Sequence, residues 1–127
     1  MNQGKKGFTL VEVMIVVAII ALLAAIAIPN LIRAKINAND TTAKASLKSV
    51  STALENYYTI NNAYPAGTTQ LLGAAPPYLT IDYFNGIHNG YTYTATLTSY
   101  TYSISAYPAS SSLGTTTLTI ATGGVWQ

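Results

Sequence analysis

One unbroken apolar run dominates the N-terminal part of the chain. From Val13 to Ile28 no side chain is polar, and the stretch from Leu10 to Ile28 carries a single charge, that of Glu12. As a helix this stretch would be about 28 Å long, at about 1.5 Å per residue, against a hydrocarbon core of about 30 Å in a bilayer. The pattern therefore predicts a membrane-spanning helix.

Beyond Pro29 the helical pattern continues and becomes amphipathic. Six apolar residues share one face of a 3.6-residue period: Ile36, Ala43, Leu47, Val50, Leu54 and Tyr57. We predict one helix from Phe8 to about Asn61, with this stripe buried against a domain. Because proline lacks an amide hydrogen, we expect a kink or local melting between Ala25 and Pro29.

The opposite side of the predicted helix is polar. Its side chains are Lys44, Lys48, Ser51 and Glu55. We interpret them as a solvated face that contributes solubility and weak ion pairing. A second interpretation is that some of them form contacts between copies of the chain, together with Arg33 and Lys35.

Turn residues and alternating strands follow the helix. Asn61 and Asn62 favour a helix end, and residues 63–90 are rich in glycine and proline, which indicates loops. Residues 91–96 and 100–105 alternate strictly around a short turn, and residues 115–121 alternate again. We predict an α+β fold, in which an antiparallel sheet of three or four strands covers the C-terminal half of the helix and Trp126 caps the core.

Glu12 is the anomaly of the apolar run. A carboxylate in a lipid-exposed helix costs about 2.5 to 3.5 kcal/mol on insertion scales, so a functional partner is expected. If the chain is cut after Gly7, the new amine of Phe8 lies about 6 Å before Glu12 along the helix axis. In a parallel stack of helices displaced by about one turn, that amine would pair with a neighbour's Glu12 and fix the register.

The sequence from Lys5 to Glu12, followed by the apolar run and Pro29, resembles the N-terminus of a type IV prepilin. The same motif occurs in pilins and in type II secretion pseudopilins. The resemblance implies the pilin fold, removal of a leader (residues 1–7) by a prepilin peptidase, and N-methylation of Phe8. It also implies a filament-core half of the helix over residues 8–33 and a soluble domain over residues 34–127.

The resemblance further implies partners and a location. The precursor would cross the bacterial inner membrane once, in contact with lipid, and Lys5 and Lys6 place its N-terminus in the cytoplasm. An assembly platform driven by an ATPase would polymerise it into a homopolymer at the cell surface, or in the periplasm for a pseudopilin. An ordinary signal peptide cleaved near Ala25-Ile26-Ala27 is the competing interpretation, which the length of the run and Glu12 disfavour.

Composition excludes several classes of function. Without Lys5 and Lys6 the chain has four basic and four acidic side chains, so it lacks the basic surface of a nucleic-acid-binding protein. It has no cysteine, unlike many type IV pilins, so packing and sheet hydrogen bonds must hold the C-terminal region. The single histidine, His88, lies in a Gly/Asn-rich loop without companion ligands, and we predict neither an enzyme nor a cofactor or metal site.

Three further features have an ordinary and a functional interpretation. Asp82 and Asn85 offer oxygen ligands for calcium, although one carboxylate makes a poor site. Asn39-Asp40-Thr41 matches a glycosylation acceptor pattern but lies inside the predicted helix. Four tyrosines at alternate strand positions are expected on a common face, either as cross-strand packing or as an exposed adhesive surface; they are Tyr91, Tyr93, Tyr100 and Tyr102.

These observations lead to three hypotheses of function. The first is the structural subunit of a type IV pilus used for adhesion, motility or DNA uptake. The second is the major pseudopilin of a type II secretion system, a class whose C-terminal region usually carries several carboxylates. Only Asp82 follows Glu55 here, which favours the pilus. The third is an exported binding domain anchored by its N-terminal helix, which Glu12 disfavours because a plain anchor gains nothing from a buried acid.

Overall fold

A computed structural model describes residues 7–127 of the chain, and the proposed leader, with Lys5 and Lys6, lies almost wholly outside them. The elements are α1 (Leu10–Asn61), α2 (Thr69–Leu72), β1 (Tyr91–Leu97), β2 (Tyr102–Pro108), β3 (Leu118–Ala121), a 3₁₀ turn (Thr122–Gly124) and β4 (Val125–Trp126). The chain divides into two compact units, Met1–Ala34 and Lys35–Gln127. This is the expected α+β fold, with four antiparallel strands.

Helix α1 confirms the long helix of the sequence analysis. It stays helical through Pro29, so the local melting is not observed, and the kink remains a prediction. Its end is also as expected, because Asn62 has a left-handed backbone with φ of 55°. The loop-rich segment differs from the expectation only in containing the single turn of α2.

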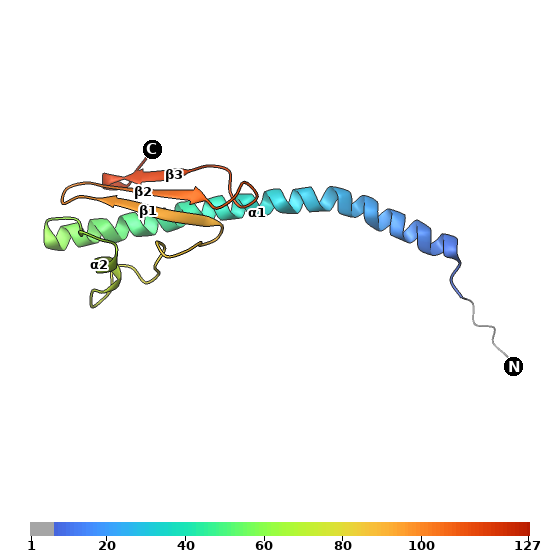
Figure 1. Ribbon diagram of the computed structural model, residues 1–127, viewed down its shortest axis with the longest axis horizontal. Coiled ribbons are helices and arrows are strands. Elements are labelled where there is room, and N and C mark those ends of the chain that lie inside the picture. The colour runs from blue at the N-terminus through green and yellow to red at the C-terminus, as the bar shows by residue number, and fades with distance from the viewer. Residues whose placement is uncertain (1–6) are drawn as a thin grey trace. The chain divides into compact units, whose positions relative to one another are not determined.

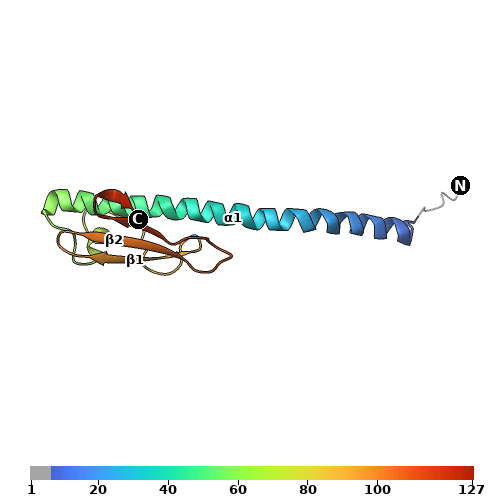
Figure 2. The ribbon, with the colours of Figure 1, turned by 90° about the horizontal axis from the view of Figure 1, so that it is seen from above.

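The second unit is built on the predicted helix stripe. Figures 1 and 2 show the sheet lying along the C-terminal half of α1, with strands in the order β1-β2-β3-β4. Within the stripe Ala43, Leu47, Val50 and Leu54 are fully or almost fully buried, whereas Ile36 and Tyr57 are half-buried. The sheet contributes Tyr91, Tyr93, Tyr102, Ile104, Ala106 and Ile120 to the same core. Full burial of one such large apolar side chain is worth about 1.5 to 3 kcal/mol.

Strand positions correct part of the tyrosine prediction. The turn between β1 and β2 is longer than expected and is closed by the Thr98 amide, which donates to the Thr101 carbonyl at 2.9 Å. Tyr100 therefore lies in the turn and is 75% exposed, while Tyr91, Tyr93 and Tyr102 face the core. These three tyrosines thus pack in the core, and they do not form an exposed adhesive surface. Trp126 does not cap the core, since it lies in the two-residue β4 and is 45% exposed.

We had expected the polar side of α1 to be a solvated face, but two of its four side chains make hydrogen bonds to distant parts of the fold. Ser51 is 2% exposed, and its hydroxyl lies 2.7 Å from that of Tyr102, which also accepts the Gly124 amide. Glu55 accepts hydrogen bonds from the Tyr64 hydroxyl and from the Gly123 amide, at 3.1 and 2.9 Å. Burial, followed by the carboxylate of Glu55, raises the pKa of Tyr64 well above its usual value. Lys44 and Lys48 are exposed.

A second carboxylate, that of Asp40, also holds α1 to distant parts of the fold. Asp40 accepts hydrogen bonds from the hydroxyls of Tyr91 and Thr115, both at 2.7 Å. Gly114 makes this possible, because a Cβ at that position would lie 2.6 Å from the Tyr91 hydroxyl oxygen. The cysteine-free C-terminal region is therefore held by side-chain hydrogen bonds to α1 as well as by packing and the sheet.

Candidate functional site

The N-terminus of α1 is closed by a reciprocal pair of hydrogen bonds. The Thr9 amide donates to the Glu12 carboxylate at 2.8 Å, and the Glu12 amide donates to the Thr9 hydroxyl oxygen at 3.2 Å. The Thr9 hydroxyl itself donates to the same carboxylate at 2.9 Å. This arrangement is a capping box, which satisfies amides that the first turn of a helix leaves without partners.

The capping box changes the interpretation of Glu12. The sequence analysis named only the amine of a neighbouring copy as a partner of this carboxylate, but Thr9 supplies two donors within the same turn. The signal was present in the sequence as Thr-x-x-Glu directly before an apolar run, and the sequence analysis missed it. Glu12 is therefore held in one place, pointing toward the residues that precede the helix.

Gly7 and Phe8 lie just before this cap and are open to solvent. The Phe8 side chain is 87% exposed, and a Cβ added at Gly7 would meet nothing within 4 Å. No fold-stabilising contact of Gly7 therefore explains its presence. A cut between these residues would leave an amine one helical turn before the Glu12 carboxylate, as expected above.

The apolar span that follows is exposed along its whole length. Its large side chains between Leu10 and Ile28 are 51 to 75% exposed. Within residues 7–127, α1 is the one helix long and apolar enough to cross a membrane. Exposing such a continuous apolar surface to water is unfavourable, so lipid or other protein chains must cover it.

Comparisons with known proteins decide the family. Residues 2–28 match the model of the prokaryotic N-terminal methylation motif. The type IV wide pilus major component PilA4 of Thermus thermophilus is 39% identical over 93 residues, which make up 70% of this chain and 71% of that relative. The chain belongs to the type IV pilin family. The fold and the prepilin-type N-terminus of this pilin therefore agree with the resemblance noted from its sequence.

Two other relatives match shorter parts of the pilin. The type IV major pilin protein PilA of Myxococcus xanthus is 43% identical over 75 residues, or 59% of this chain and 34% of its own. The type II secretion system core protein G of Pseudomonas aeruginosa is 40% identical over 65 residues, or 51% of this chain and 46% of its own. The pilin thus spans less than half the length of each of these two relatives.

The remaining candidates of the sequence analysis have structural roles in this pilin. The Asn39 side-chain amide donates to the Leu113 carbonyl at 2.8 Å, so the nitrogen needed for glycosylation is already engaged. Asp82 accepts the Phe84 amide at 3.1 Å, and the described residues contain no group of three potential metal-ligating acids, histidines or cysteines. His88 stacks edge-on against Tyr83, with ring centres 5.7 Å apart.

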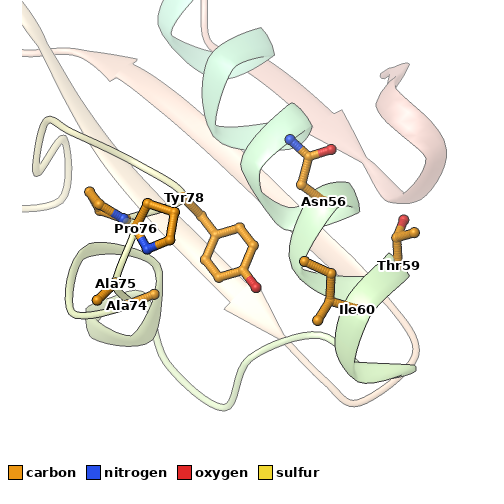
Figure 3. Close-up of a pocket in the computed structure, with 8 residues that line it drawn as sticks. Asn56, Thr59, Ile60, Ala74, Ala75, Pro76 and Tyr78 are labelled. Atoms are coloured by element: carbon orange, nitrogen blue, oxygen red, sulfur yellow. The ribbon is translucent and has the colours of Figure 1, made fainter.

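One groove was not predicted. Its volume is about 470 Å³, and Figure 3 shows the ring of Tyr78 projecting between the 74–77 loop and the last turns of α1. None of its lining residues is charged; they are Asn56, Thr59, Ile60, Ala74, Ala75, Pro76, Pro77 and Tyr78. The groove contains no acid, histidine, lysine or cysteine.

Proposed function

We propose that this pilin is the structural subunit of a type IV pilus, polymerised from the inner membrane through its N-terminal helix. The observation that carries the proposal is the continuously exposed apolar span with a single, capped acid at its start. Before assembly, lipid covers the span. In the filament, the same surface of neighbouring copies covers it.

Processing precedes assembly in this proposal. A prepilin peptidase cuts between Gly7 and Phe8, and Phe8 is then N-methylated. The match of residues 2–28 to a methylation motif supports this processing, and so do the open surroundings of Gly7. A side chain at Gly7 would obstruct an enzyme that must approach the backbone closely at the membrane surface.

The Phe8 amine of one copy and the Glu12 carboxylate of another form the assembly contact. In the single chain Thr9 already holds the carboxylate, so the incoming amine meets an acid that needs no reorientation. Burying either charge alone in the helix bundle would be costly, and pairing them offsets that cost. The pair therefore favours one axial register over others.

The proposal includes partners outside the filament. An inner-membrane platform and its ATPase extract the cleaved pilin from lipid and extend the filament to the cell surface. The filament would serve adhesion, movement or DNA uptake, and nucleic acid is not expected to bind the subunit directly. The same type of assembly in the periplasm would make it a major pseudopilin, and the similarity to core protein G supports this second candidate.

Glu12 variants test the assembly contact. We expect Glu12→Val to insert and lose its leader normally, because removing an acid favours insertion, but to give few or no filaments. Glu12→Gln keeps an oxygen that accepts the Thr9 amide and removes only the charge, so it should also fail to assemble. Val13→Leu is the matched control in the same turn.

Sheared filaments and leader-cleaved membrane protein are measured side by side by immunoblot. Normal assembly of Glu12→Gln would mean that capping, and not charge pairing, is what Glu12 provides. Normal assembly of both variants would contradict the charge pair and favour an exported domain with a plain membrane anchor.

To separate pilus from pseudopilin, filaments at the cell surface are compared with secretion of folded proteins in a deletion strain.

A further inference from the structure

The outer face of the sheet is lined by hydroxyl groups. Because Tyr91, Tyr93, Tyr102, Ile104 and Ile120 point into the core, the alternate residues of each strand point outward. These residues define the hydroxyl face: Thr92, Thr94, Thr96, Ser103, Ser105, Tyr107, Thr119 and Ala121. The register places them side by side, with Thr94 opposite Ser105 and Ser105 opposite Thr119. All but Ala121 carry a hydroxyl.

Several of these hydroxyls have no partner within the described part of the chain. Ser105 and Thr119 bond to each other at 3.0 Å, and the Thr92 hydroxyl donates weakly to the Tyr107 carbonyl at 3.4 Å. No such bond involves the side chains of Thr94, Thr96 or Ser103. A hydroxyl both donates and accepts, so an array of hydroxyls is complementary to a second copy of itself.

The face also lacks the charges that usually keep exposed sheets apart. Residues 83–127 contain no Asp, Glu, Lys or Arg, so no charged side chain can lie on any strand. Soluble surfaces typically carry about a quarter to a third charged residues, and like charges on two facing surfaces repel each other. Two copies of the hydroxyl face can therefore approach each other without electrostatic repulsion.

The size of the face decides what kind of association is possible. Three strands of up to seven residues cover roughly 14 by 24 Å, or about 340 Å². A stable interface needs about 800 Å² on each partner, so one face is too small to hold two single subunits together. A filament repeats the face at every subunit, and many weak contacts made in parallel give strong binding.

We propose that the hydroxyl face joins neighbouring filaments of this protein into bundles. The hydroxyl face of a subunit in one filament contacts the hydroxyl face of a second copy of the chain in the adjacent filament. This inference rests on the proposed function, because it needs filaments. Single subunits do not associate through the face, and bundling is nearly independent of ionic strength because the contact contains no charge.

Charged substitutions on an exposed strand position test the proposal. In Thr94→Lys and Thr94→Glu filaments, like charges meet across every contact, and we expect about a tenfold or greater fall in the bundled fraction. Thr52→Lys and Thr52→Glu are matched controls, since Thr52 is exposed on α1 away from the sheet and its hydroxyl donates only to its own helix. They make the same changes in net charge and should bundle normally.

The bundled fraction of purified filaments is measured by low-speed sedimentation and electron microscopy, and total filament by high-speed sedimentation. Wild-type bundling should change less than about twofold between low and high salt. Either Thr94 variant bundling like the wild type would overturn the proposal. So would wild-type filaments that stay single, or that bundle only when a polysaccharide such as dextran is added. Absence of any wild-type filament would instead contradict the proposed function.

Discussion

Replacing Asp40 with alanine removes the carboxylate that fastens α1 to the segment between β2 and β3. The Tyr91 and Thr115 hydroxyls each lose a 2.7 Å hydrogen bond, and the Thr115 amide loses a long one of 3.4 Å. Tyr91 keeps a second bond to the Thr116 carbonyl at 3.1 Å, so its buried hydroxyl is not left without a partner. The loss is therefore partial.

The magnitude follows from these contacts. A hydrogen bond to a charged group contributes about 1.5 to 3 kcal/mol, and this site is partly open to solvent, which reduces the value. We expect Asp40→Ala to lower the free energy of unfolding by about 2 kcal/mol and Tyr91→Phe to lower it by about 1 kcal/mol. Because the two residues share one bond, the double variant should lose about 1 kcal/mol less than the sum of the two.

The same site gives a pH dependence. Burial acts to raise the pKa of Asp40, but the hydrogen bonds from Thr115 and Tyr91 and the charge of Lys44 outweigh it, so this pKa lies below its usual value. A lowered folded-state pKa adds stability above the unfolded-state pKa of about 3.9, and that stability is lost as the pH falls toward the folded-state value. Asp40→Asn should therefore be less stable at neutral pH, with a difference that shrinks below about pH 4.

These differences are measured by urea denaturation of the full chain in detergent micelles. Unfolding is monitored by the near-ultraviolet circular dichroism of the buried tyrosines. Thr41→Ala is the matched control, because the exposed Thr41 hydroxyl donates only to the Asn37 carbonyl of its own helix. A loss below about 0.5 kcal/mol for Asp40→Ala, or strictly additive effects in the double variant, would refute the role assigned to this carboxylate.

Two further predictions concern processing and folding. Gly7→Val should leave uncleaved, full-length protein in the inner membrane. The valine side chain would obstruct the peptidase, and it would meet no other part of the fold. Mature protein of normal size on an immunoblot would show that Gly7 is not needed for cleavage. A fragment from Ala34 to Gln127 should be soluble and unfold cooperatively, since residues 35–127 form a compact unit with their own core; an unfolded circular dichroism spectrum would mean that neighbouring subunits are needed to hold the sheet.

The sequence was sufficient for features that depend on periodicity. Ala43, Leu47, Val50 and Leu54 are separated by helical spacings, and the structure buries all four. The strands were found for the same reason, because tyrosine and threonine alternate along β1. Such patterns are local, and each residue's environment follows from its neighbours in the chain.

Features that depend on distant partners were not predictable in this way. Ser51 and Glu55 fall on the polar side of the helix, and they gain hydrogen-bond partners only because the chain returns to that side at Tyr102 and Gly123. Tyr100 fits the alternation but lies in the turn, because the residues around Thr98 form a longer connection than the pattern suggests. The capping box was different, since Thr9 and Glu12 are close in sequence and only the motif had to be recognised.

Asp40 and Glu55 of α1 also set an order of events in folding. Asp40 reaches Thr115, 75 residues later, and Glu55 reaches Gly123, 68 residues later. A chain that emerges N-terminus first exposes the helix stripe well before these partners exist, and closing such long loops is slow. The unit formed by residues 35–127 therefore completes its core only after its last residues have been synthesised. A stalled or shortened chain would expose an uncovered helix to chaperones and proteases.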